Sequence, residues 1–299
     1  MLDVFLDVVL PVALVALVGG AVGRWQSIPV GPISSLVFYL FSPALVFHSL
    51  AETHVSAEAS LKIVAVLLAT YAVMYLAATF WSALARHSQS FRAAFALAVI
   101  TPNQGNMGLP VALLAFGQPG LDIAVVNFVA GATLTYTAGV FVASMAAGSR
   151  RNAMRAPFRY PVLYAAAAGV LVNVLGIDLP TTLDAPTASL ADAAVPTMLV
   201  VLGLQLHHAV GRDRLIDTAM VNASRLLIAP LVAWSVATAF GLDGADRGTL
   251  VVLAAMPTAV VATILATEFG AYPAFVTRAV VTTTLTSMLT LTILISLVR

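Results

Sequence analysis

Residues 101–110 read TPNQGNMGLP and lie inside an apolar run near Phe91–Phe116. The stretch holds two prolines, two glycines and the three carboxamides of Asn103, Gln104 and Asn106. Proline removes a backbone donor and obstructs the preceding turn, and glycine favours unwinding, so we expect a helix to break here. Pro102 alone would be equally consistent with a simple kink. The whole cluster instead predicts a substrate or ion site, because irregular backbone inside a membrane must line a cavity or be buried in protein.

The composition around this stretch is that of an integral membrane protein. Of 299 residues, 61% are hydrophobic and 9% charged, and the mean hydropathy is +1.00. Soluble domains carry roughly 25% charged residues. Since about 20 apolar residues form a helix that crosses a lipid bilayer, the chain has room for roughly ten spans and for no separate soluble domain.

The same composition excludes several classes of function. With no cysteine, the chain has no disulfide and no thiolate chemistry, and we expect neither a cofactor nor a metal site. The net charge of +1 argues against nucleic acid as a partner. An intramembrane enzyme lacks support, because the spans contain no Gly-x-Ser-x-Gly and no cluster of His, Asp and Glu with ligand spacing.

The hydropathy pattern predicts ten spans in two groups of five. The first group is expected near Val4–Gly23, Pro32–Leu50, Leu61–Leu84, Phe91–Phe116 and Leu121–Ala147. The second is expected near Phe158–Leu175, Pro186–Leu206, Thr218–Phe240, Thr249–Phe269 and Pro273–Val298. A polar link, Gly148–Arg159, separates two units, residues 1–148 and 149–299.

The basic residues in the loops predict the orientation of the chain, because cytoplasmic loops collect Lys and Arg. Nine lie in alternate loops: Arg24, Arg86, Arg92, Arg150, Arg151, Arg155, Arg159, Arg212 and Arg214. The opposite side holds three: Lys62, Arg247 and Arg299. Both termini are therefore expected outside the cell.

The two units resemble each other around their prolines. Pro43 in the second expected span matches Pro196 in the seventh, and Pro102 matches Pro257. The two prolines are 59 residues apart in the first unit and 61 residues apart in the second. Because each unit has an odd number of spans, the copies insert in opposite orientations, as in the inverted repeats of secondary transporters. The span near Thr249–Phe269 should therefore break at Pro257, beside the first break.

Two half-helix starts that converge would suit a carboxylate, because their free amides carry partial positive charge. The candidate binding residues on the two breaks are Asn103, Gln104, Asn106, Pro110, Pro257, Thr258, Val261 and Thr263.

A few further polar residues within or at the ends of the spans have two possible roles each. Glu268 and Arg278 either pair with each other or leave Glu268 for coupling or gating. His48 is either a satisfied polar residue or a proton relay, whereas His207 and His208 are expected at the cytoplasmic interface. The hydroxyls of Thr133–Thr137 and Thr282–Ser287 either line the cavity or bond back to their own helices.

Four motifs, in order, resemble those of the auxin efflux carrier family. They are Pro43–His48, Pro102–Pro110, Pro196–Gly203 and Met256–Gly270. The chain departs from the plant carriers at Ala262, where they have a further proline. It also lacks their long cytoplasmic loop, which indicates a prokaryotic member in the inner membrane.

The resemblance implies an all-helical fold similar to bile-acid symporters and sodium/proton antiporters. In that plan, helices 1, 2, 6 and 7 form a scaffold that also makes a homodimer. Helices 3–5 and 8–10 form a moving transport unit, whose broken helices 4 and 9 cross at the substrate in an elevator-type mechanism.

The expected function is secondary active or facilitative transport of small organic anions, meaning auxin-like carboxylates or dicarboxylates. Efflux of a monoanion would need no coupling ion, since leaving a cell at −100 mV releases about 2.3 kcal/mol. The alternative is a sodium- or proton-coupled symporter, in which Glu268, Asn103 and Asn106 supply oxygen ligands.

Overall fold

The computed structural model describes residues 2–52, 55–147, 161–205 and 213–299. These residues form helices and short connections, and the described part of the chain contains no strand beyond one isolated bridge. The expected all-helical fold is thus confirmed for them. The polar link at 148–160 and the residues His207 and His208 lie outside the described ranges.

Seven helices in the described ranges are long and apolar enough to cross a membrane. They run over Leu2–Trp25, Val30–Glu52, Ala57–Leu84, Gln104–Ala146, Thr181–Leu204, Leu215–Ala239 and Pro273–Val298. Two shorter apolar helices, Gln89–Ile100 and Pro161–Leu175, accompany them. This agrees with a chain that is folded within a bilayer.

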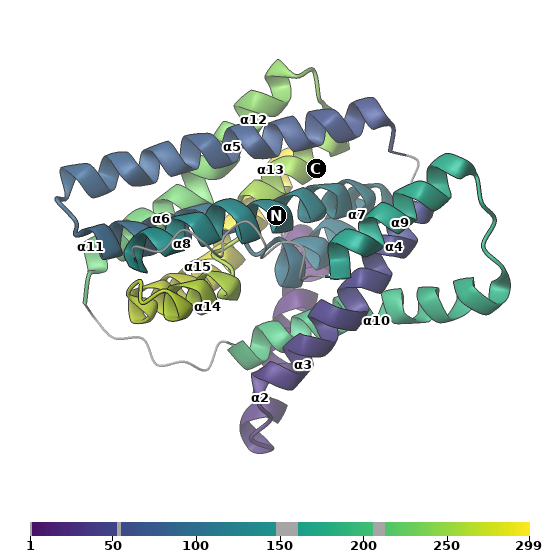
Figure 1. Ribbon diagram of the computed structural model, residues 1–299, viewed down its shortest axis with the longest axis horizontal. Helices are drawn as coiled ribbons and strands as arrows, with labels where there is room; N and C mark the ends of the chain where they lie inside the picture. Colours follow the sequence, from purple (N-terminus) through teal and green to yellow (C-terminus); the bar gives the residue numbers. More distant parts are fainter. Residues whose placement is uncertain (1, 53–54, 148–160, 206–212) are drawn as a thin grey trace.

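A smaller helix group occupies the lower right of Figure 1. It comprises α2 (Leu10–Trp25), α3 (Val30–Leu36), η2 (Val37–Phe41), α4 (Ser42–Glu52), α9 (Pro161–Leu175) and α10 (Thr181–Gln205). Helix α10 packs against both α2 and α4, and α4 packs along α9. The short α1 (Leu2–Val4) and η1 (Phe5–Val9) lead into α2.

A larger helix group occupies the upper left of Figure 1. Its first part comprises α5 (Ala57–Leu84), α6 (Gln89–Ile100), η3 (Gln104–Gly108), α7 (Leu109–Leu134), η4 (Thr135–Gly139) and α8 (Val140–Ala147). Its second part comprises α11 (Leu215–Ala223), η6 (Ser224–Ile228), α12 (Ala229–Ala239), α13 (Gly244–Ala254), α14 (Val260–Glu268) and α15 (Pro273–Val298). Helix α6 is surrounded by α5, α8, α11, α14 and α15, so almost all of its residues are buried.

Local sequence explains where several of these helices begin and bend. The Ser56 and Ser88 side chains accept hydrogen bonds from the Ala59 and Phe91 amides, and so cap the first turns of α5 and α6. Helix α7 is interrupted at Gly117, whose φ of 69° suits a residue without a Cβ. This interruption lies where the sequence separates the runs ending at Phe116 and starting at Leu121.

The starts of α10 and α13 differ most from the expected helix boundaries. Helix α10 begins at Thr181 rather than near Pro186, because the Pro180 carbonyl already accepts hydrogen bonds from the Leu183 and Asp184 amides. Helix α13 begins at Gly244 rather than near Thr249, directly after Asp243.

Glycines bring α2 and α10 into close contact within the smaller group. A Cβ added to Gly19 would lie 2.8 Å from Val200 Cα, and one added to Gly203 would overlap the Ala16 carbonyl. In membranes, small residues allow helix backbones to approach closely, and dispersion contacts then hold the helices together. The α2–α10 contact therefore depends on these glycines.

Replacing Gly203 by Ala should separate α2 from α10 and destabilise the protein by about 1–3 kcal/mol, the usual cost of overpacking. The melting temperature in detergent measures this effect. Gly31→Ala is the matched control, because a Cβ at Gly31 meets no atom within 4 Å. An equal melting temperature for both variants would contradict the close-contact interpretation.

A polar and aromatic cluster closes one end of the larger group. His87, in the turn between α5 and α6, places Nε2 3.1 Å from Asp217 Oδ1 on α11, and Trp81 Nε1 donates to the same oxygen at 3.0 Å. The Arg214 guanidinium stacks over Phe91, with 4.4 Å between its carbon and the ring centroid. Burial lowers the pKa of His87 below its ordinary value of 6.5, and this outweighs the raising effect of the Asp217 carboxylate.

This cluster should make stability depend on pH. Because the pKa of folded His87 lies below that of the unfolded chain, the folded state binds fewer protons between the two values. The contribution of His87 is complete above about pH 6.5 and is lost as the pH falls below it. Melting temperatures from pH 8 to pH 5.5 should therefore fall more steeply for the wild type than for His87→Gln, and equal slopes would contradict the assignment.

Candidate functional site

Two extended segments pair with each other at the centre of the larger group. Helix α6 ends at Ile100 and α13 ends at Ala254. Beyond these ends, the Asn103 amide donates to the Pro257 carbonyl at 2.7 Å, and the Ala259 amide donates to the Thr101 carbonyl at 2.8 Å. These two hydrogen bonds form a short antiparallel bridge, centred on Pro102 and Thr258.

The prolines fit this geometry for a local reason. Each interrupts a helix, because it lacks an amide donor and its ring clashes with the preceding turn. Within the bridge, the donors are the amides of Asn103 and Ala259, so the missing amide of Pro102 leaves no partner unpaired. The breaks expected from TPNQGNMGLP and from Pro257 are thus both present, and the structure joins them.

Thr258 supports the bridge from the side of α6 and α15. Its hydroxyl donates to the Ala98 carbonyl at 2.8 Å, and its amide donates to Thr283 Oγ1 at 3.0 Å. Both threonine residues are fully buried. Thr258 therefore holds the two breaks together.

A cavity of about 370 Å³ lies beside the bridge, between the two helix groups. Its apolar wall includes Val30, Phe128, Val162, Val260, Val261, Ile264, Val280 and Val281. Its polar lining comprises Ser34, Ser42, Asn103, Gln104, Asn106, Thr135, Tyr136, Thr263 and Thr277. None of the described residues around this cavity carries a charged side chain.

The first residues of two helices contribute to this lining: Gln104–Asn106 at the start of η3, and Val260–Val261 at the start of α14. The first amides of a helix have no carbonyl partner within it and carry partial positive charge. Asn103 is 5% exposed, and neither its Nδ2 atom nor Ser34 Oγ has a hydrogen-bond partner in the described structure. The cavity thus presents unpaired polar atoms and two positive helix ends.

The predicted binding residues divide into two sets. Asn103, Gln104, Asn106, Val261 and Thr263 line the cavity. Pro110, Pro257 and Thr258 are buried and lie outside its lining. The last three shape the two breaks rather than contact the cavity.

Other expected polar residues lie elsewhere. His48 lies in the smaller group, with Nε2 3.5 Å from Glu52 and Nδ1 3.8 Å from Asp184. Glu268 is exposed at the far end of α14, whereas Arg278 on α15 is only 5% exposed. A Glu268–Arg278 pair, one of the two alternatives for these residues, is absent from the ion pairs of the described residues.

The hydroxyl residues mainly bond to their own helices, as one of the two interpretations predicted. Those that do so are Thr133, Thr137, Thr282, Thr283, Thr284 and Ser287. Thr135 and Tyr136 are the exceptions in this set that line the cavity.

Sequence reasoning missed Arg225. This residue lies on η6, is 2% exposed, and donates to three backbone carbonyls at the breaks. The sequence did contain a signal for Arg225, because an arginine inside a membrane span is by default a candidate functional residue.

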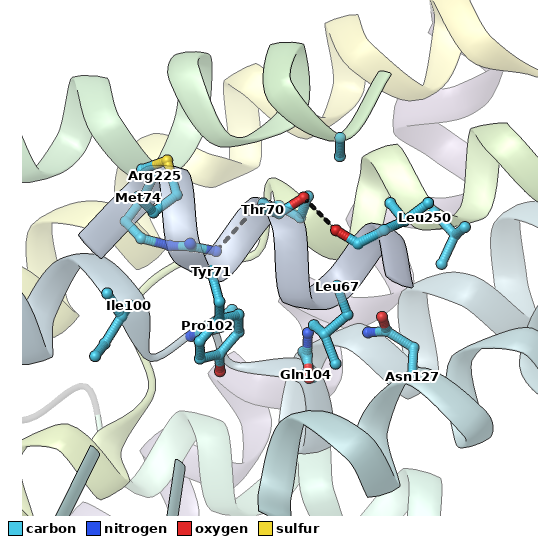
Figure 2. A pocket seen from close by; sticks show the side chains of 13 residues that line it. Leu67, Thr70, Tyr71, Met74, Ile100, Pro102, Gln104, Asn127, Arg225 and Leu250 are labelled. Atoms are coloured by element: carbon cyan, nitrogen blue, oxygen red, sulfur yellow. Dashed lines mark hydrogen bonds between the residues drawn. The ribbon is translucent and has the colours of Figure 1, made fainter. Parts of the chain in front are cut away.

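A second, much smaller cavity lies next to Arg225. Its volume of about 20 Å³ has room for a single water molecule. Figure 2 shows Arg225 and Asn127 on either side of Pro102 and Gln104, with Thr70 and Tyr71 of α5 nearby. Because Pro102 and Gln104 also line the larger cavity, the two cavities adjoin the same broken segment.

Apolar helices around two paired breaks, with a cavity at the breaks, are the arrangement of a membrane transport protein. The family described as Membrane transport protein matches residues 4–295, and the chain belongs to this family, which includes the auxin efflux carriers.

Relatives of the chain are prokaryotic. An uncharacterized transporter of Methanothermobacter thermautotrophicus is 28% identical over 239 residues, which cover 79% of this chain and 78% of the relative. An uncharacterized transporter of Methanocaldococcus jannaschii is 23% identical, over 88% of this chain and 89% of the relative. A "Putative malonate transporter" of Rhizobium meliloti is 25% identical, over 90% of this chain and 87% of the relative.

The Asn103 carboxamide gives the cavity a testable polar contact. Asn103→Ala removes that carboxamide and keeps the backbone bond to Pro257. A hydrogen bond to a charged group contributes about 1.5–3 kcal/mol, so anion binding should weaken roughly 10- to 100-fold. Flux into proteoliposomes measures the loss. Asn173→Ala, the same change on α9 outside the cavity lining, is the control, and wild-type flux in Asn103→Ala would contradict the site.

Proposed function

We propose that the chain is a secondary transporter of small organic anions, and that the anion binds in the 370 Å³ cavity with its carboxylate at the two helix starts. The observation that carries this proposal is the convergence of η3 and α14 on one cavity, next to the Asn103 side-chain nitrogen Nδ2, which has no hydrogen-bond partner in the described structure. Backbone amides form charge-assisted hydrogen bonds to carboxylates, which are shorter and stronger than neutral ones.

The lining also favours one kind of anion. Neutral carboxamides, hydroxyls and helix starts hold an anion without a lysine or arginine in contact with it, so that binding stays moderate and release stays fast. The valine and phenylalanine wall suits an apolar body attached to the carboxylate. Carboxylates of this kind, including auxin-like monocarboxylates, form the proposed substrate class. The relative named for malonate makes small dicarboxylates the first competitors to test.

We further propose that the chain consists of ten spans arranged as two inverted repeats, 1–148 and 149–299, with both termini outside a prokaryotic inner membrane. The similar proline spacing supports the repeat, and the loop arginines support the orientation. In this arrangement, the smaller helix group is the scaffold and forms a homodimer.

Transport then requires that the cavity open to each side of the membrane in turn. The cavity is bounded by α3, α4 and α9 of the smaller group and by η3, α7, η4, α14 and α15 of the larger group. An elevator-type movement of the larger group against the smaller one would carry the bound anion across, because both breaks belong to the larger group. A sodium- or proton-coupled symporter is the alternative.

Current measurements on proteoliposomes test this proposal. Indole-3-acetate, malonate and malate are applied in turn, while voltage, the sodium gradient and the pH gradient are varied separately. We expect at least one carboxylate to carry current that follows voltage alone. Coupled symport would instead require sodium or a pH gradient. Protein-free liposomes are the control, and the absence of flux for every carboxylate would contradict the proposal.

A further inference from the structure

Arg225 makes four hydrogen bonds to three backbone carbonyls at the two breaks. Nη1 donates to Val99 at 3.2 Å, and Nη2 donates to Ala254 at 2.7 Å and to Met256 at 2.8 Å. Nε also donates to Met256, at 3.2 Å. The guanidinium is thus shared between both breaks, although Val99 and Met256 are far apart in the sequence.

These carbonyls belong to the ends of two half-helices. Val99 lies in the last turn of α6, Ala254 is the last residue of α13, and Met256 follows in the break. The last carbonyls of a helix have no amide partner and carry partial negative charge, equivalent to about half an electron. Two such ends meet at Arg225, whereas the positive starts of η3 and α14 line the larger cavity.

Such carbonyls are the usual ligands of a coupling ion. In secondary transporters with broken helices, unwound carbonyls and half-helix ends coordinate the sodium ion or the proton site. In this chain, the permanently charged guanidinium of Arg225 on η6 lies against these carbonyls in place of such an ion. No carboxylate of the described residues forms an ion pair with Arg225, so the two helix ends supply its main compensation.

We propose that Arg225 is a built-in substitute for the coupling cation, so that transport needs no cation from solution. This inference rests on the proposed function and adds its energy source, which is then the membrane potential and the anion gradient. Arg225 is a positioning residue, because it acts on the substrate site through the carbonyls that fix the two breaks. The neighbouring cavity of about 20 Å³ is too small for a hydrated sodium ion and holds at most one water.

The first test needs no substrate. Thermal unfolding in detergent is compared in sodium, N-methylglucamine and guanidinium chloride at equal, low ionic strength. The wild type should melt at the same temperature in all three salts. Arg225→Ala should melt lower, and millimolar guanidinium should raise its melting temperature in a concentration-dependent way, because a ligand that binds the folded state stabilises it.

Arg247→Ala is the matched control, since Arg247 is half-buried on α13, away from the breaks, and stacks on Trp234 with 4.3 Å between its guanidinium carbon and the ring centroid. Its melting temperature should not respond to guanidinium. Equal responses of the two variants, or no response of Arg225→Ala, would overturn the inference.

The second test measures flux with the carboxylate that the wild type transports. Wild-type flux should be equal in sodium and in N-methylglucamine. Arg225→Ala should lose flux and regain part of it in guanidinium. Arg225→Lys should keep flux that does not depend on sodium. Wild-type flux that requires sodium overturns the inference even if Arg225→Ala does not fold. If no carboxylate moves at all, the proposed function fails, whereas the melting test still decides the role of Arg225.

Discussion

The two hydrogen bonds between residues 101–103 and 257–259 are the constraint on which the rest of the site depends. Inside a membrane, an interrupted helix leaves amides and carbonyls that lipid cannot satisfy. Here the two interruptions satisfy each other, through the Asn103 amide and the Ala259 amide. Beside the bridge, the Thr283 hydroxyl accepts a hydrogen bond from the Thr258 amide, and the Thr258 hydroxyl donates to the Ala98 carbonyl. Each break is therefore possible because the other one lies beside it.

The bridge also separates charge. Because both helices are broken at the same place, two helix starts and two helix ends gather around the bridge. The starts of η3 and α14 line a cavity without charged side chains. The ends of α6 and α13 meet the guanidinium of Arg225. One backbone arrangement thus provides partly positive helix starts at the cavity and partly negative helix ends that the guanidinium of Arg225 neutralises.

The two helix groups are held together internally in different ways. Glycine contacts between α2 and α10 bring backbones together within the smaller group, where dispersion rather than the hydrophobic effect stabilises the contact. In the larger group, α6, which leads into the bridge, packs against five other helices. The cavity lies where the two groups meet.

Local sequence alone determined that helices cross a membrane and that two of them break, because hydropathy and proline act over a few residues. The similarity around Pro102 and Pro257 also predicted that the breaks lie together. Only the tertiary structure decided which side chains face the cavity: Thr258 turns to Ala98, whereas Asn103 and Thr263 line the cavity. It also brought Arg225 to the helix ends and left Glu268 exposed. Side-chain direction in irregular backbone depends on segments more than 100 residues apart, which no local pattern contains.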